Sequence, residues 1–127
     1  MQTIIKHRDA SAEYYTEERC HINELSNSQD DPGLSIAEAR VVPGDTTRWH
    51  RVIGLIERYV VLQGTGLVEV DALLPQPVHP GDVVLIPPGS RQRIANTGKN
   101  DLVFLAICSP RFQQQYYQDA EDEQPEQ

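Results

Sequence analysis

The sequence has few cysteines and no long hydrophobic run. Its two cysteines, Cys20 and Cys108, lie far apart and outside any CxxC spacing, so neither a disulfide framework nor a thiolate zinc site is indicated. No stretch approaches the roughly 20 apolar residues that a membrane helix needs. The first 15 residues also lack the apolar centre of a signal peptide. We therefore expect a cytoplasmic protein that makes no membrane contact.

Basic residues are also scarce, because 11 Lys and Arg stand against 19 Asp and Glu, for a net charge of −8. Five of the acids lie in the last nine residues, so the rest of the chain carries only about −3. There is no basic stripe that could neutralise phosphates, and nucleic acid is therefore not an expected partner. A length of 127 residues with 39% hydrophobic residues is typical of one globular domain.

Short strand patterns separated by turn residues fill the middle of the chain. They alternate apolar and polar positions or are rich in β-branched residues, and Gly and Pro end them. No apolar stripe with the 3.6-residue period of a helix interrupts them. The pattern predicts an all-β sandwich or barrel. The predicted strands are 35–42, 56–63, 67–71, 83–86, 91–96 and 102–108.

The two ends of the chain lack this regularity. Residues 1–33 form an N-terminal segment that we expect to supply an edge strand or a dimer contact, and residues 34–110 form the barrel. In the C-terminal segment, 111–127, the sequence RFQQQYYQ predicts a short helix. The acidic sequence DAEDEQPEQ that follows has little to bury and is predicted to be disordered.

Three polar side chains occur where alternating strands could turn them inward, namely His50, Glu57 and Gln92. If their strands line one cavity, an imidazole, a carboxylate and a carboxamide oxygen could bind a divalent metal and leave positions open for substrate. Each residue also has a structural interpretation. His50 and Gln92 could be hydrogen-bonded barrel residues, and Glu57 could face outward in a salt bridge with Arg58 or Arg51.

Two further residues are expected to point to the same side of their strands as this group, because alternate residues of a strand share one face. Tyr59 lies two positions from Glu57, and Arg48 lies two positions from His50. We predict both as substrate-binding residues, with Arg48 holding an anionic group such as a carboxylate or phosphate. Core packing or a rim position is the alternative for both. Trp49 is expected to point away from His50.

The first of the two segments with these residues resembles the first motif of the cupin superfamily. That motif runs glycine, five residues, His-x-His, three or four residues, Glu, six residues, glycine. Its positions are matched in type and spacing by Gly44, His50, Glu57 and Gly64.

The second segment resembles the second cupin motif, which runs glycine, five residues, Pro-x-Gly, two residues, His, three residues, Asn. The matching residues are Gly81, Pro87, Gly89 and Asn96. The two motifs span a little under half of the chain. The resemblance implies a double-stranded β-helix, the jelly-roll barrel of cupins, and cupins of this kind commonly pair as dimers. We therefore expect a homodimer that binds a small molecule.

Two positions depart from the cupin pattern. The second histidine of the first motif is replaced by Val52, and the histidine of the second motif is replaced by Gln92. The remaining set of His50, Glu57 and Gln92 implies a weaker site for Fe, Mn, Ni or Zn. The resemblance thus implies a metal-dependent enzyme, similar to cupin dioxygenases or isomerases. The alternative is a metal-free cupin that binds a small molecule or regulates without catalysis.

Overall fold

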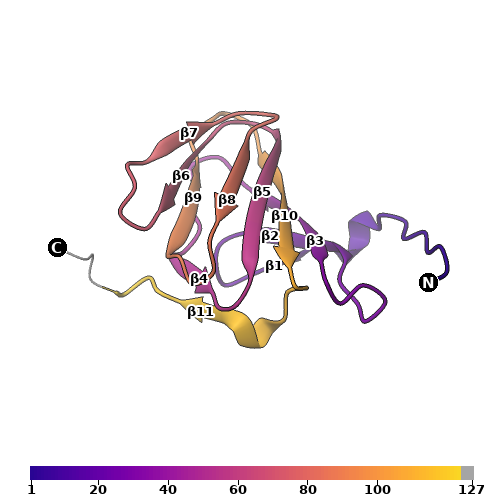
Figure 1. The fold of residues 1–127 in the computed structure, drawn as a ribbon. Coiled ribbons are helices and arrows are strands. Elements are labelled where there is room, and N and C mark those ends of the chain that lie inside the picture. The colour runs from indigo at the N-terminus through magenta and orange to yellow at the C-terminus, as the bar shows by residue number, and fades with distance from the viewer. Residues whose placement is uncertain (124–127) are drawn as a thin grey trace.

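The structure, a computed structural model, describes residues 1–123 and is almost entirely β-structure. Two antiparallel sheets face each other and enclose the core (Figure 1). The predicted all-β jelly roll is confirmed. No helix among the described residues is long and apolar enough to cross a membrane.

One sheet has six strands, two from the N-terminal segment and four from the predicted barrel. Its order is β1 (Tyr14–Tyr15), β2 (His21–Ser26), β3 (Ser35–Val41), β10 (Leu102–Ser109), β5 (Ile56–Gln63) and β8 (Val83–Ile86). The bounds of β5 and β8 are those that the sequence predicts. The pairing of β10 with both β3 and β5 makes it the central strand of this sheet.

The other sheet has five strands and lies opposite. Its order is β11 (Tyr117–Asp119), β4 (His50–Val52), β9 (Gln92–Asn96), β6 (Gly66–Val70) and β7 (Gln76–Val78). The short strands β4, β7 and β11 were not predicted from the sequence, because three residues are too few to show an alternating pattern.

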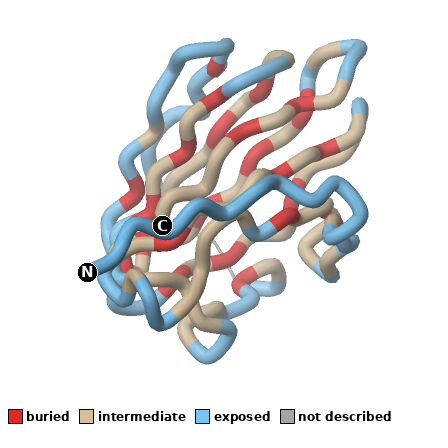
Figure 2. The backbone as a smooth tube through the Cα atoms, turned by 90° about the vertical axis from the view of Figure 1, so that its right-hand side faces the viewer, coloured by how far each residue is buried: buried red, intermediate tan, exposed pale blue. Residues whose placement is uncertain are grey.

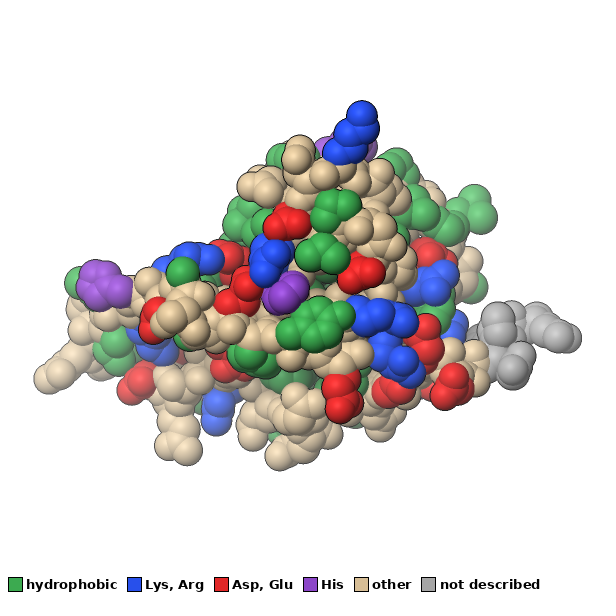
Figure 3. Space-filling view, turned by 180° about the vertical axis from the view of Figure 1, so that it is seen from behind, with side chains coloured by type: hydrophobic (Ala, Val, Ile, Leu, Met, Phe, Trp, Pro, Cys, Tyr) green, Lys and Arg blue, Asp and Glu red, His purple; other side chains and the backbone are tan. Residues whose placement is uncertain are grey.

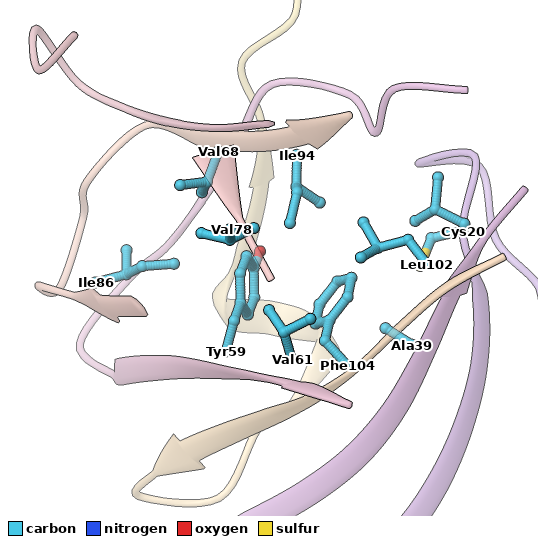
Figure 4. Packing of buried hydrophobic residues seen from close by; sticks show 11 residues of the cluster. Cys20, Ala39, Tyr59, Val61, Val68, Val78, Ile86, Ile94, Leu102 and Phe104 are labelled. Atoms are coloured by element: carbon cyan, nitrogen blue, oxygen red, sulfur yellow. The ribbon is translucent and has the colours of Figure 1, made fainter. Parts of the chain in front are cut away.

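The main core lies between the two sheets. In Figure 4, Tyr59, Val61 and Phe104 of the six-stranded sheet extend toward Val68 and Ile94 of the other. Buried positions recur along the strands while the loops at their ends are exposed (Figure 2). This is the alternation expected when one face of each sheet packs inward.

The turn between β5 and β6 requires glycine at Gly64. Its φ is +82°, and a Cβ there would lie 2.6 Å from the backbone oxygen of Asp101. Any other residue would have to displace that backbone. The glycine that ends the first cupin-like motif therefore holds the β5–β6 hairpin against the loop before β10.

The N-terminal segment reaches the outer edge of the six-stranded sheet through β1 and β2. Residues 1–9 precede a short 3₁₀ helix, η1 (Ala10–Ala12), and form no regular structure. Ile4 and Ile5 are exposed in this arm, which extends away from the barrel in Figure 1. The dimer contact expected of this segment stays a prediction.

The C-terminal segment differs from the prediction. Its helix is only the 3₁₀ turn η2 (Gln114–Tyr116), and β11 follows it directly. The prediction of disorder is wrong for residues 119–123, and residues 124–127 lie outside the described residues. Ala120 is buried, and Glu121 accepts a hydrogen bond from the backbone N–H of Trp49. Composition could not reveal this order because the partners lie some 70 residues earlier in the chain.

Candidate functional site

The two sheets bring the predicted site residues together in the barrel. His50 on β4 and Gln92 on β9 are cross-strand partners in the five-stranded sheet. Glu57 and Tyr59 come from β5 in the opposite sheet. All four are buried, with exposed fractions of 5% for His50, 1% for Gln92, 8% for Glu57 and 3% for Tyr59. Glu57 therefore faces inward, and no salt bridge joins it to Arg58 or Arg51 among residues 1–123.

A chain of hydrogen bonds joins three of these side chains across the sheets. The hydroxyl of Tyr59 donates to Oε1 of Gln92 at 2.5 Å, and Nε2 of Gln92 donates to Oε1 of Glu57 at 2.8 Å. The carboxamide oxygen and nitrogen thus each have a defined partner. Gln92 bridges a phenol and a carboxyl, and its oxygen is taken by Tyr59.

Burial sets the ionisation of Glu57. Desolvation raises the pKa of its carboxyl, and nearby His50 and the hydrogen bond from Gln92 offset part of that rise. The surroundings thus favour the neutral acid more than water does. A carboxyl of this kind can donate a hydrogen bond or a proton.

The surroundings of His50 fix its tautomer. Nδ1 lies 2.9 Å from the carbonyl oxygen of Arg48, and because a carbonyl only accepts, Nδ1 carries the proton. Nε2 has no hydrogen-bond partner among residues 1–123. The ring stacks on Tyr117 of β11, with centroids 5.3 Å apart. The imidazole is held in place and keeps one nitrogen available.

His50, Glu57 and Tyr59 line a cavity of about 390 Å³, which we call the barrel cavity. Much of its wall is apolar, and Gln92 lies behind that wall. The aromatic wall residues are Tyr14, Tyr15, Tyr59, Phe104, Phe112 and Tyr117. The acidic wall residues are Glu17, Glu18, Glu24 and Glu57.

Arg48 is not brought into the barrel cavity. Its guanidinium donates two hydrogen bonds to the carboxylate of Asp119, at 3.2 and 3.0 Å, and does not line the wall. The expectation of a shared strand face failed because β4 begins only at His50, so residues 48–50 do not follow one regular strand. The predicted anion-binding group is thus paired with an acid from the C-terminal segment.

Several wall residues come from segments that gave no functional signal in the sequence. Glu18 lies in the turn between β1 and β2, with Oε2 3.8 Å from Nδ1 of His50. Phe112 and Tyr117 come from the C-terminal segment. The irregular composition of both ends hid their position beside the barrel cavity.

The residues present do not fit a resident divalent metal. Val52 lies on the cavity wall where cupins have a histidine, and the only metal-binding atom of Gln92 accepts from Tyr59. Nε2 of His50 and the carboxylate of Glu57 are left, whereas catalytic metal sites use three or more protein ligands. The described residues contain no group of three His, Cys, Asp or Glu side chains placed to hold a metal ion.

The remaining arrangement is suited to hydrogen bonding and proton transfer. Nε2 of His50 can accept a hydrogen bond, and a carboxyl whose pKa burial raises can donate one, both from the wall of a largely apolar cavity. Tyr59 is held by Gln92 and serves to position that amide against Glu57.

The chain resembles two proteins in sequence and one solved structure in fold. The chain is 32% identical over 114 residues to an uncharacterised protein of Methanocaldococcus jannaschii, covering 88% of this chain and 90% of that protein. It is 35% identical over 71 residues to an oxalate-binding protein of Thermotoga maritima, covering 56% and 58% of the two chains. Its fold matches the Streptomyces nucleoside dehydratase Pac13 with a TM-score of 0.76 and 13% identity, over 93% and 92% of the chains.

The family itself is shown by a separate match. Residues 37–108, which hold both glycine-containing motifs, match the family described as the cupin domain. This match covers more than half of the chain and reaches from β3 to β10, whereas β1, β2 and β11 lie outside it. The chain belongs to the cupin family.

Proposed function

We propose that this cupin binds a small organic molecule in the barrel cavity and holds a polar group of that molecule with His50 and Glu57, without a resident metal. One observation carries the proposal: the side chains of two buried residues, His50 and Glu57, line an otherwise largely apolar cavity, and Nε2 of His50 has no hydrogen-bond partner among residues 1–123. Its volume of about 390 Å³ is near the lower end of ligand pockets, which favours a small ligand.

The pair suits a ligand that has both a donor and an acceptor. Nε2 of His50 accepts a hydrogen bond from a ligand hydroxyl, and the neutral form of Glu57 donates one to a ligand oxygen. The same two groups can take and return protons. That is the chemistry of isomerases and dehydratases that work by acid–base catalysis.

The relatives suggest two probe ligands. Pac13 is described with bound uridine, an uncharged nucleoside, so uridine is a reasonable neutral probe. The Thermotoga relative is described as binding oxalate, a dianion. The barrel cavity of this chain has no Lys or Arg on its wall, so we expect oxalate to bind weakly here.

A metal-dependent dioxygenase or isomerase, with Fe, Mn, Ni or Zn on His50, Glu57 and Gln92, would need a different arrangement. Gln92 would have to release Tyr59 and turn its oxygen toward the metal. No contact in the described residues favours that change. We therefore use metal binding as the contrary outcome of the experiment.

The test is protein NMR on the ¹⁵N-labelled chain, titrated with uridine, a set of small amines and oxalate. The proposal expects at least one of the uncharged or amine probes to shift the amides of cavity-wall residues in a saturable way, with a Kd below about 1 mM. It is abandoned if no probe saturates. Saturation by oxalate alone would also contradict it.

Two matched variants and one metal titration complete the design. Ala106→Leu adds three carbons at the cavity wall and should abolish binding, whereas Ala72→Leu makes the same change on an exposed turn and should not. Paramagnetic Mn²⁺ should leave the amides near His50 and Glu57 unbroadened. Selective broadening there at micromolar Mn²⁺ that disappears in His50→Ala would replace the proposal with a metal site.

A further inference from the structure

We infer that the ligand of the barrel cavity is a small organic cation that carries an ammonium group. This inference rests on the proposed function and specifies its ligand class. It follows from the charges on the wall, from where the basic residues of the chain are held, and from the aromatic rings around the cavity.

The wall of the barrel cavity holds the acidic side chains of Glu17, Glu18, Glu24 and Glu57, and neither lysine nor arginine. Burial shifts Glu57 toward its neutral form, so the negative charge comes from Glu17, Glu18 and Glu24. Glu17 and Glu24 are exposed, Glu18 is half-buried and Glu57 is buried, so carboxyl groups occur from the mouth to the floor. A concave surface with one sign of charge and low-dielectric walls concentrates ligands of the opposite sign.

Half of the described acids outside the cavity, seven of fourteen, pair with arginine. On the space-filling surface, basic and acidic side chains lie next to one another over much of the visible face (Figure 3). The ion pairs outside the cavity are Arg8–Glu38, Arg19–Glu121, Arg40–Glu13, Arg40–Asp101, Arg48–Asp119, Arg51–Glu123 and Arg93–Glu69. None of these arginines pairs with an acid of the cavity wall.

Three arginines lie close to the cavity in sequence or contact, and each is directed to another partner. Arg19 and Arg48 pair with acids of the C-terminal segment. Arg111 donates to Oδ1 of Asn27, a wall residue, but is not itself part of the wall. Among residues 1–123, these three arginines therefore leave the carboxylates of Glu17, Glu18 and Glu24 for another cation.

Glu18 is the acid best placed to receive that cation. Its side chain is only 18% exposed, and it makes no hydrogen bond or ion pair with Lys or Arg among residues 1–123. Its nearest partner is Nδ1 of His50 at 3.8 Å, whose proton is already donated to the carbonyl of Arg48. A partly desolvated carboxylate without a cation is unfavourable, and a bound ammonium group would offset that cost.

The aromatic wall explains why the cation is organic. Tyr14, Tyr15, Phe112 and Tyr117 line the same cavity as Glu18. Aromatic faces attract substituted ammonium groups, whose charge is spread over methyl or methylene groups. A hard metal ion would instead need several oxygen or nitrogen ligands, which the wall does not bring together. A ligand with an ammonium group near Glu18 and a hydroxyl near His50 would pair with both the carboxylate and the imidazole.

The test compares two molecules of the same shape that differ in charge. Choline has a quaternary nitrogen where 3,3-dimethylbutan-1-ol has a carbon, and both carry the terminal hydroxyl. We expect choline to bind roughly 5- to 30-fold more tightly by NMR titration, from cation–π and carboxylate attraction. Equal or tighter binding of the neutral alcohol overturns the inference.

A matched pair of variants locates the charge effect. Glu18→Gln should weaken choline binding about threefold or more and leave the alcohol unchanged, because it removes one wall charge and keeps the side-chain shape. Glu69→Gln removes the same charge from β6, outside the cavity, and should change neither affinity. A similar loss of choline affinity in both variants would contradict the site and indicate only a general effect of net charge.

Failure of this inference is distinguishable from failure of the proposed function. If uridine or the neutral alcohol saturates the cavity amides and choline does not, the cavity binds small molecules but the cation inference is wrong. If neither choline nor any other probe saturates these amides, both are wrong.

Discussion

Removing one hydroxyl group tests whether the buried chain from Tyr59 through Gln92 to Glu57 acts as a unit. In Tyr59→Phe the ring keeps its packing against Phe104, whose centroid lies 4.5 Å away. Oε1 of Gln92, in a side chain that is 1% exposed, loses the one donor it has among residues 1–123. Leaving a buried acceptor unpaired costs about 1–3 kcal/mol, so the free energy of unfolding should fall by that amount.

The second arm of the cycle removes the bridging amide. Gln92→Leu leaves both the Tyr59 hydroxyl and the Glu57 carboxyl without this partner and should cost about 3–5 kcal/mol. The double variant should be less destabilised than the sum of the two single variants by at least about 1 kcal/mol, because the Tyr59–Gln92 bond can be lost only once.

Urea unfolding provides the measurement. Trp49, which lies under the guanidinium groups of Arg91 and Arg93, gives the fluorescence signal. Tyr117→Phe is the matched control, since that hydroxyl has no hydrogen bond among residues 1–123, and it should change stability by less than about 0.5 kcal/mol. The reasoning is refuted if Tyr59→Phe is as mild as this control and the cycle is additive.

Three further predictions concern ionisation, the C-terminal segment and assembly. Because burial raises the pKa of Glu57, its neutral form stabilises the fold below its unfolded pKa of about 4.3, and this contribution is lost as pH rises through the folded pKa. Glu57→Gln should thus be more stable than wild type at pH 7 in urea unfolding, with the difference vanishing near pH 4. Asp119→Asn removes the ion-pair partner of Arg48 and should lower the free energy of unfolding by about 0.5–1 kcal/mol. Hydrogen exchange of the β11 amides should become faster, and unchanged exchange would contradict a role of this ion pair in holding β11 against β4. Sedimentation of the wild type should find a species of twice 14.3 kDa. Deletion of residues 1–12, which include exposed Ile5, should convert it to a monomer. A wild-type species near 14.3 kDa would refute the dimer.

The barrel strands were predictable because their signals are local. The run 56–63 and the run 83–86 combine β-branched residues with Gly or Pro at their ends, and both became strands with the predicted bounds. The cupin-like motifs bring His50, Glu57 and Gln92 close together, although Gln92 lies behind the cavity wall and the metal site predicted for the three stays a prediction. The spacing of these motifs sets the position of each side chain along its strand.

The partners of these side chains were not predictable. Gln92 was expected to turn an oxygen toward a metal, but that oxygen accepts from Tyr59, which lies 33 residues earlier. Arg48 was expected to hold an anion, but Asp119 reaches it from 71 residues away. The first pairing depends on how β5 and β9 face each other across the two sheets, and the second on where the C-terminal segment crosses the barrel. Periodicity within a segment carries no information about either.

The wall of the barrel cavity is built from the family-matched barrel and from the two ends of the chain. Residues 37–108, which match the family, supply the floor with His50 and Glu57, whereas Glu18, Tyr14 and Tyr117 lie before or after that range. The chain ends can therefore change in sequence without disturbing the interlocked strands beneath them. Under the proposed function, grafting both ends onto a related barrel is expected to carry the ligand preference with them, because the ends supply Glu18, Tyr14 and Tyr117 to the wall.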